Sequence, residues 1–452
     1  MLDWIYKKRL KGDLEIWVSN GWVSSDRAVA ILEAQDIDDG RSRLPMALAG
    51  IGVVCVALAL FAFIAANWGV IPKTGKLVGI AVLIFLAHGA AAFFAKKGRT
   101  GLSDLATGFA TLVFVGGMAL VGQIFHLPSD WQGGAFLVCL GGLAAAWLTG
   151  SKTSLVIAAV AAISWQLERS GFEPSSAIET LISLAFLVAV FAHPFIYPSR
   201  TSRWAAIAVL LVTYGRWFGD VGDLLGSGDD IIVAMLLGGL GGLCCVMIQL
   251  GPVIDLYAKW SSYKPAKSHA HWLMLRSLQD IGFIILCGLI VLALVFAPEL
   301  SSDVSAEGLL PLPASLPLGT AILLCGAGLL LSFKTSKSLV LFASIGLSLI
   351  AVLMPTLTNN VIVLSGTSLA ALIALCALGT WYNNRYWMLC AYLGLTAVAL
   401  WLLQVTIGSL LGQSLFFLVA GLLLLGMALW LARIFRHQKP DQVKANTAVE
   451  AK

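Results

Sequence analysis

The sequence predicts an all-α, polytopic membrane protein of about 14 transmembrane helices, preceded by a short cytoplasmic helical hairpin. Three observations support this fold class. Hydrophobic residues make up 59% of the chain and charged residues only 12%, whereas roughly a quarter of a soluble domain is charged. Apolar runs of membrane-crossing length recur along the chain, and Lys and Arg gather in every second connection between them. A lipid bilayer is therefore the main solvent of this chain.

Residues 1–43 differ in composition from the rest and form the first predicted domain, a cytoplasmic amphipathic helical hairpin. Apolar residues recur there at near-helical spacing up to Val18. Gly21 can end this helix, and Ser24 or Ser25 can cap the next one. The segment holds 7 basic and 8 acidic residues, which argues against nucleic acid as a partner. Docking of a partner and anchoring on the membrane surface both remain open as its role.

The apolar runs divide the remaining chain into spans of about the length that a bilayer requires, roughly 20 residues. A first membrane part covers 44–170, a second covers 171–434, and a polar cytoplasmic tail covers 435–452. The shortest run ends in Ser-Trp-Gln and is either a full span or a tilted half-helix. The predicted spans are 44–66, 75–95, 104–125, 132–149, 152–167, 177–197, 203–219, 231–256, 277–297, 317–333, 337–354, 359–380, 386–406 and 412–434.

The distribution of basic residues predicts the orientation of these spans. With the N-terminus inside, all but four of the 29 Lys and Arg residues fall in the connections on the cytoplasmic side. The four on the outer side are Lys73, Lys76, Arg169 and Arg216. We therefore expect both termini in the cytoplasm. The net charge of +5 reflects this asymmetry and is not a sign of nucleic-acid binding.

No motif of a catalytic or metal site is present, so we expect neither enzymatic activity nor a cofactor. The sequence contains no GxSxG nucleophile motif and no HExxH zinc motif. Its eight cysteines all lie in apolar runs and none forms a CxxC pair, which predicts small core residues and neither disulfides nor metal ligands.

Four motifs occur in order over the first third of the chain: "GWVSSDRAVAIL", "AANWGVIPKTGK", "GQIFHLPSDW" and "AAAWLTGSKTSLVIAA". In order and spacing they resemble the bacterial membrane family known as domain of unknown function 2157, over roughly residues 1–170. The resemblance implies a multi-pass protein of the bacterial inner, or cytoplasmic, membrane. It implies nothing about a reaction or a substrate.

Two of these motifs place polar and aromatic residues at the predicted outer ends of spans one, three and four. A titratable imidazole beside a carboxylate there exceeds what a turn requires, and it would titrate near neutral pH. We expect a substrate or proton site in an outward-facing pocket. Alternatively, the Asp only caps a helix, the Trp residues form an interfacial belt and the amides tie the loops. The candidate residues are Asn67, Trp68, Gln123, His126, Asp130 and Trp131.

Further polar residues lie inside the predicted spans, where each is a functional candidate by default. Arg216 belongs to an aromatic cluster at an outer end, next to Asp220 and Asp223, and can pair with either carboxylate. A buried or interfacial structural role is expected for the others. These are His88, His193, Gln249 and Gln404.

Two kinds of function fit these observations. The first is a transporter or flippase-like carrier of a small or lipid-linked substrate, which the span number, the pocket and a candidate repeat of 150–164 at 332–348 favour. The second is a non-enzymatic membrane sensor or assembly subunit that acts through the N-terminal hairpin. The expected partners are membrane lipids and, in the second case, another membrane or envelope protein.

Overall fold

The computed structural model describes residues 72–126, 128–169, 176–225, 228–260, 269–297, 300, 307–332 and 336–406, with scattered positions between 14 and 62. These residues form two compact units. The first comprises the described residues up to Trp165, and the second begins at Gln166. The predicted division of the chain at residues 170 and 171 stays a prediction.

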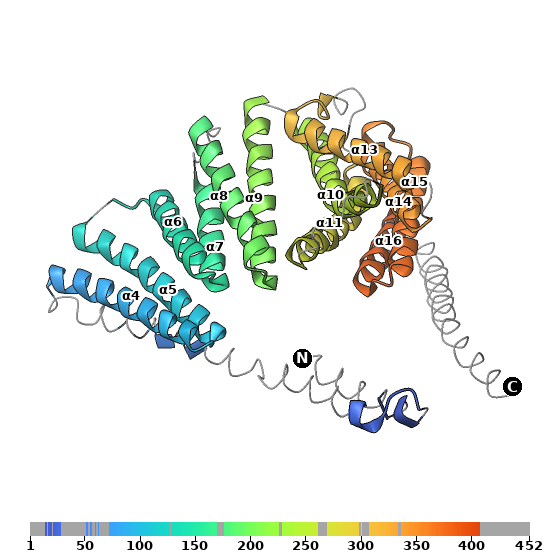
Figure 1. Cartoon of the computed structure of the whole chain (residues 1–452). Helices are drawn as coiled ribbons and strands as arrows, with labels where there is room; N and C mark the ends of the chain where they lie inside the picture. Colours follow the sequence, from blue (N-terminus) through green and yellow to red (C-terminus); the bar gives the residue numbers. More distant parts are fainter. Residues whose placement is uncertain are drawn as a thin grey trace. The chain divides into compact units, whose positions relative to one another are not determined.

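The described chain contains long α-helices, one short 3₁₀ helix and no strand (Figure 1). The first unit holds α4 (Lys73–Lys96), α5 (Thr100–Phe125), α6 (Trp131–Thr149) and most of α7 (Lys152–Glu168). The second holds α8 (Ala177–Ile196), α9 (Arg200–Leu225), α10 (Asp229–Trp260), α11 (His269–Phe296), α13 (Leu312–Ser332), α14 (Ser336–Leu353), η2 (Met354–Thr356), α15 (Val361–Trp381) and α16 (Arg385–Thr406).

Ten of these helices are long and apolar enough to cross a membrane, which confirms an all-α, polytopic membrane protein. Two predicted spans form helices that fall short of this description. The helix α7 has only 17 residues, and α9 carries five charged side chains within its 26 residues. The predicted spans 412–434 and most of 44–66 lie outside the described residues.

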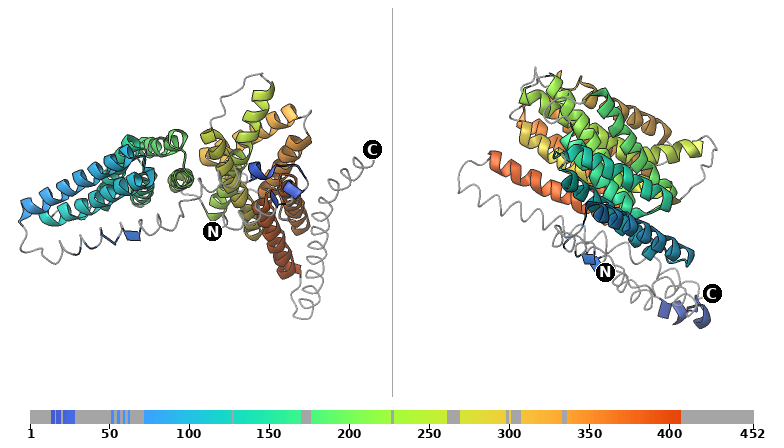
Figure 2. Two further views of the ribbon diagram at one scale, coloured as in Figure 1. Left: turned by 60° about the horizontal axis from the view of Figure 1, so that its bottom comes forward. Right: turned by 90° about the vertical axis from the view of Figure 1, so that its left-hand side faces the viewer.

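In the first unit, α4 and α5 pack side by side as an antiparallel hairpin (Figure 2). Gly98 turns the chain between them with a φ of +70°, a conformation that favours glycine. Helices α6 and α7 approach each other closely. A Cβ atom on Gly142 would lie 3.2 Å from the Cα atom of Ala158, so only a small residue fits there.

The "GSKTS" part of the fourth motif ties α5 to α7. The carboxylate of Asp104 on α5 accepts hydrogen bonds from the Ser151 hydroxyl at 2.7 Å and the Thr153 hydroxyl at 2.6 Å. It also accepts the Thr153 backbone N–H at 3.1 Å, and so caps the N-terminus of α7 from a different helix. Further along, the hydroxyls of Ser154 and Thr111 lie 2.9 Å apart and continue this polar contact into the interior.

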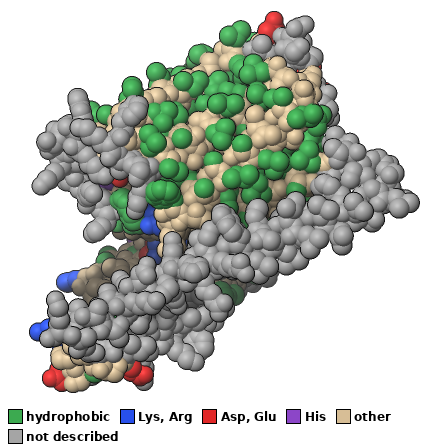
Figure 3. All heavy atoms as spheres, turned by 90° about the vertical axis from the view of Figure 1, so that its right-hand side faces the viewer, with side chains coloured by type: hydrophobic (Ala, Val, Ile, Leu, Met, Phe, Trp, Pro, Cys, Tyr) green, Lys and Arg blue, Asp and Glu red, His purple; other side chains and the backbone are tan. Residues whose placement is uncertain are grey.

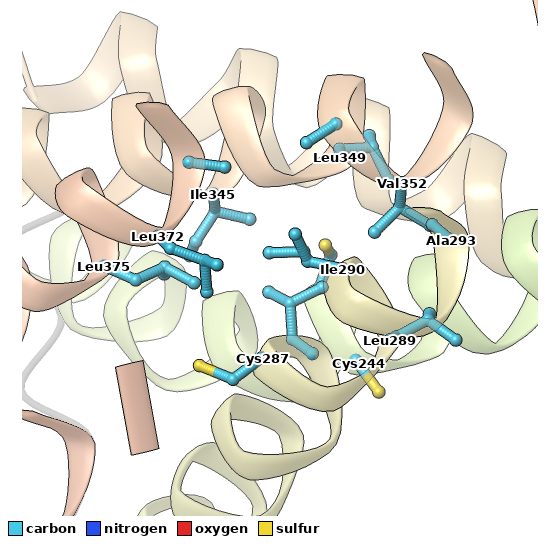
Figure 4. Packing of buried hydrophobic residues seen from close by; sticks show 14 of the residues in the cluster. Cys244, Cys287, Leu289, Ile290, Ala293, Ile345, Leu349, Val352, Leu372 and Leu375 are labelled. Atoms are coloured by element: carbon cyan, nitrogen blue, oxygen red, sulfur yellow. The ribbon is translucent and has the colours of Figure 1, made fainter. Parts of the chain in front are cut away.

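The second unit is built around a single apolar core. Helices α10, α11, α13, α14, α15 and α16 gather around it (Figure 1), and its side chains interlock (Figure 4). Phe283 of α11 stacks on Trp387 of α16, with ring centroids 4.7 Å apart and planes 7° from parallel. The indole N–H of Trp387 in turn donates to Asp280 at 2.8 Å. Trp387 therefore links α11 and α16 through both an aromatic stack and a hydrogen bond.

Helices α10 and α13 touch backbone to backbone. A Cβ atom on Gly242 would lie 2.5 Å from the backbone nitrogen of Leu318, and one on Gly239 would lie 2.6 Å from the carbonyl oxygen of Pro313. The glycine cluster in α10 therefore serves close helix packing, which is the role that small residues usually have in membrane helices.

A hydrogen bond from α9 satisfies a backbone carbonyl at the start of α13. Pro317 has no N–H, so it cannot donate to the carbonyl of Pro313 one turn earlier. The hydroxyl of Tyr214 on α9 donates to that carbonyl instead, at 2.8 Å. A carbonyl inside a bilayer has no water to bond, so this contact both satisfies the backbone and fixes α9 against α13.

The side of the second unit that carries α13 to α16 presents a face with many hydrophobic and few charged side chains (Figure 3). Leu330, Ile373 and Leu393 are each more than half exposed, at 73%, 56% and 59%. Leucine and isoleucine exposed over such an area suit contact with lipid chains rather than with water.

Candidate functional site

The structure describes four of the six residues of the predicted pocket, and all four are exposed: Gln123, His126, Asp130 and Trp131. Asn67 and Trp68 lie outside the described residues. Gln123 belongs to the last turn of α5, whereas Trp131 is the first residue of α6 and is 70% exposed. The four therefore flank one connection, but the hydrogen bonds among described residues do not link any two of them.

Two of these residues also shape the α5–α6 connection. His126 ends α5 in the left-handed conformation, with a φ of +52°, and so does not continue the helical face of Gln123. The side chain of Asp130 accepts the Gly133 backbone N–H at 2.7 Å and caps α6. The expected cap is thus present. A role of these residues in binding stays a prediction.

A buried charged cluster lies in the second unit, at the end of α9 that the sequence predicts to face outward. Asp220 lies between two arginines, because its Oδ1 is 3.1 Å from Nε of Arg216 and its Oδ2 is 3.3 Å from Nη2 of Arg169. Arg216 and Asp220 are one helical turn apart on α9, whereas Arg169 directly follows α7. The Nη2 group of Arg216 also donates to the Arg169 carbonyl oxygen at 3.1 Å. The three residues therefore form a closed triangle.

These charges are well removed from solvent. The side chains of Arg169, Asp220 and Arg216 are exposed by only 2%, 10% and 17%. Burial lowers the pKa of the Arg169 guanidinium, while Asp220 and Glu179 raise that pKa and Arg216 lowers it further. An arginine side chain stays protonated in proteins, so the guanidinium keeps its charge. The triangle thus holds ionised groups whose burial is costly unless each is paired.

Aromatic side chains of α9 lie beside this triangle along the helix. Tyr214 and Trp217 pack edge to face, with ring centroids 6.3 Å apart, and Tyr214 makes the bond to α13 described above. The charged end of α9 is therefore anchored to the core by one tyrosine and to the α7–α8 connection by Arg169.

Sequence reasoning anticipated part of this cluster. The expected pairing of Arg216 with a neighbouring carboxylate is confirmed for Asp220, while Asp223 is exposed on the same helix. The participation of Arg169 was missed, since 51 residues separate it from Asp220. A signal was available, because Arg169 is one of the four basic residues on the predicted outer side.

The other polar residues inside the helices have structural surroundings. The Nδ1 atom of His88 lies 2.9 Å from the Ile84 carbonyl of its own helix, and His193 is fully buried with its ring 5.1 Å from that of Tyr197. Gln249 is also fully buried, its side-chain amide has no hydrogen-bond partner among the described residues, and its expected structural role stays a prediction. The side chain of Gln404 lies outside the described residues. Among the residues that the structure describes, no three His, Cys, Asp or Glu side chains are grouped to hold a metal ion.

The cysteines are free thiols. Cys139, Cys244, Cys245, Cys287, Cys325 and Cys376 are buried, Cys390 is partly buried and Cys55 is exposed. The expectation of core residues is confirmed for the six buried ones.

One family model matches the N-terminal part of the chain. Residues 15–155 match the family model DUF2157, described as a predicted membrane protein. The resemblance seen in the motifs is thereby confirmed. No curated protein and no solved structure matches the chain.

The DUF2157 match contains the predicted pocket residues and the Asp104 contacts with Ser151 and Thr153. It ends before Arg169, so the charged triangle belongs to the part of the chain beyond the match. The family description supports a membrane location and names no activity.

Proposed function

We propose that this protein is a non-enzymatic carrier in the bacterial inner membrane, which moves a small or lipid-linked substrate and binds it at an outward-facing end. Both termini then lie in the cytoplasm, and membrane lipids are its immediate partners. The observation that carries the proposal is the buried triangle of Arg169, Asp220 and Arg216 in a bundle of apolar helices. Ionised groups at membrane depth are costly, and they commonly mark substrate or ion pathways.

The position of the triangle supports a carrier with an outer binding site. Arg169 and Arg216 are two of only four basic residues outside the cytoplasmic connections. A basic residue needed only for orientation belongs on the cytoplasmic side. These two therefore serve another purpose, and binding of a substrate group is one that their guanidinium groups can perform.

The exposed residues of the α5–α6 connection fit the same proposal as a second part of the outer site. His126 is exposed, and the two ring nitrogens of its imidazole can form hydrogen bonds with a polar group of the substrate. The Asp130 side chain already caps α6.

The test is transport by the purified full-length protein in liposomes. Flipping of a fluorescent phospholipid is measured by bleaching with dithionite, and uptake of labelled small solutes is measured in parallel. We expect Arg216→Gln to reduce the rate at least tenfold, whereas Asp223→Asn, an exposed position on the same helix, leaves it unchanged. A wild-type protein that moves none of the lipids or solutes offered would contradict the carrier function.

The alternative, a sensor or assembly subunit, has one observation in its favour. In the N-terminal segment Trp22 is 61% exposed and Trp17 is 37% exposed, although Leu14 close by is buried. Exposed tryptophans suit either a partner surface or a membrane interface. Deleting residues 1–43 separates the two functions: a carrier keeps its transport rate in liposomes, whereas a sensor loses its cellular phenotype while the spans still insert.

A further inference from the structure

The arrangement of the charged triangle resembles a clamp around a small anion. Two guanidinium groups approach opposite oxygens of one carboxylate, at 3.1 Å from Arg216 and 3.3 Å from Arg169. Each arginine offers one nitrogen, so neither contact is a bidentate fork, and both are longer than the 2.7–2.9 Å usual for strong ionic hydrogen bonds. Asp220 therefore occupies the space between the arginines through one contact to each of them.

A second observation comes from the residue one turn before Arg169. Gln166 is fully buried, and neither its amide oxygen nor its amide nitrogen has a hydrogen-bond partner among the described residues. Burying an amide without a partner is energetically unfavourable in an apolar medium. A bound molecule with oxygen atoms would provide the missing acceptor for the Gln166 amide nitrogen.

We propose that Arg169 and Arg216 bind the anionic oxygen group of the substrate, a phosphate or a carboxylate, which takes the place of Asp220 between them. Asp220 then fills the site when no substrate is present. This inference rests on the proposed carrier function and names its substrate class. Planar guanidinium groups match phosphate and carboxylate oxygens in pairs, which an ammonium group cannot do.

The charges around the site bear on where the anion comes from. Glu179 in the first turn of α8 already acts on Arg169, and Asp229 and Asp230 add negative charge at the start of α10, so a free anion that approaches through water is repelled. A lipid head group arrives along the membrane, and its acyl chains can remain among the exposed apolar residues of the helices. The shared chemistry is an anionic oxygen group, and the source is decided by experiment.

The experiment measures binding by the full-length protein in a neutral detergent. The thermal unfolding midpoint is followed as phosphatidylglycerol, phosphatidylcholine or inorganic phosphate is added. We expect phosphatidylglycerol to raise the midpoint of the wild type and phosphatidylcholine to leave it unchanged. A rise with inorganic phosphate as well identifies a free anion as a sufficient ligand, and a rise with phosphatidylglycerol alone identifies a lipid.

The variants give effects of opposite sign. Arg169→Gln and Arg216→Gln weaken anion binding about tenfold or more, because each removes a charged donor. Asp220→Asn tightens it several-fold, because the competing charge is gone. A purely structural triangle predicts that all three variants lower the midpoint and that none binds anions better. Arg169→Lys and Arg216→Lys, which keep the charge but not the planar fork, serve if the Gln variants fail to fold.

Several results would overturn the inference. One is equal stabilisation of the wild type by phosphatidylglycerol and phosphatidylcholine, and another is undiminished anion binding in the arginine variants. The carrier function fails separately. If the anion binds through the arginines but nothing is transported, the site stands and the carrier does not. If transport continues at the full rate in both arginine variants, the carrier stands and this site does not.

Discussion

At the scale of single residues, three carboxylates that the described helices bury or half-bury, Asp104, Asp220 and Asp280, collect donors from another part of the fold. Asp104 receives two hydroxyls and a backbone N–H from the start of α7. Asp280 on α11 accepts a hydrogen bond from the indole N–H of Trp387 on α16 at 2.8 Å. It accepts a second one from the side-chain amide of Asn384, in the α15–α16 turn, at 3.3 Å. Asp220 instead receives two cations. This difference sets Asp220 apart as the charge whose role exceeds holding helices together.

A first prediction concerns Asp104. Removing the carboxylate leaves Ser151 and Thr153 buried or half-buried without their acceptor, so Asp104→Ala should lower the free energy of unfolding by about 1–3 kcal/mol. Asp104→Asn should be milder, because its amide oxygen can still accept one donor. The matched control is Lys152→Ala, an exposed residue of the same motif. Denaturation of the purified protein in detergent measures the free energy of unfolding of all three variants. Equal values would mean that the Asp104 hydrogen bonds do not stabilise the fold.

A second prediction separates shape from chemistry at His126. Its φ of +52° favours glycine or asparagine over alanine, so His126→Ala combines a lost imidazole with backbone strain of roughly 1–2 kcal/mol. His126→Asn accepts the same backbone conformation and removes only the imidazole. We expect the Asn variant to keep the wild-type unfolding midpoint and to lower the transport rate. Unchanged transport in the Asn variant would leave His126 with the sole role of ending α5.

At the scale of helices, the second unit depends on how closely α10 and α13 approach. The glycines of α10 meet the backbone of α13 in its first turns, where Pro317 has no N–H to donate to the Pro313 carbonyl. The Tyr214 hydroxyl supplies the missing donor. The contact between α10 and α13 therefore combines close backbone packing with a hydrogen bond to the Pro313 carbonyl.

A third prediction tests this contact with a matched pair of substitutions. Gly242→Ala places a Cβ atom 2.5 Å from the Leu318 backbone nitrogen, which cannot move without shifting α13. We expect a loss of about 1–3 kcal/mol in the free energy of unfolding, as for other overpacked cores. Gly319→Ala lies on α13 itself, and its added Cβ atom meets nothing within 4 Å, so it should be neutral or slightly stabilising. Comparable losses in both variants would mean that the close approach at Gly242 is not their cause, because helix propensity favours alanine over glycine at both positions.

A fourth prediction concerns the hydroxyl that joins α9 to α13. Tyr214→Phe keeps the ring beside Trp217 and removes only the donor to the Pro313 carbonyl. The expected loss is about 0.5–1.5 kcal/mol. The control is Tyr386→Phe, whose side chain is 74% exposed. If both variants unfold at the wild-type midpoint, another group satisfies the Pro313 carbonyl.

The helices themselves could be predicted from the sequence, but their contacts could not. A bilayer requires a long apolar run for each span, so such runs identify the helices in the sequence. The described α-helices correspond to twelve of the fourteen predicted runs, and ten of them are long and apolar enough to cross a membrane. Because the runs are apolar on all sides, the sequence does not indicate which face of each helix packs against another helix. The Asp104 contact reaches 47 and 49 residues along the chain and the Asp220 contact 51, distances over which no periodicity carries information. The left-handed conformation of His126 at the end of α5 is likewise a property of one residue that no periodicity predicts.

At the scale of the whole molecule, the proposed function depends on which side of the membrane each helix end faces. The first and second units are each compact, and the charged triangle belongs to the second. If the connection between α9 and α10 faced the cytoplasm, Arg169 and Arg216 would satisfy the charge rule and would need no further explanation. The orientation is therefore the premise on which the outer binding site stands.

The last prediction tests that premise on α10. This helix has 32 residues and is about 48 Å long, enough to cross a hydrocarbon core of roughly 30 Å. Ser227 precedes it and Ser268 follows it, so cysteines at these two positions should lie on opposite sides. In a Cys55→Ser background, which removes the exposed native thiol, a membrane-impermeant maleimide should label Ser227→Cys in intact cells. Ser268→Cys should react only after the membrane is permeabilised. The inverted pattern would place the triangle on the cytoplasmic side, and labelling of both positions in intact cells would mean that α10 does not cross at all.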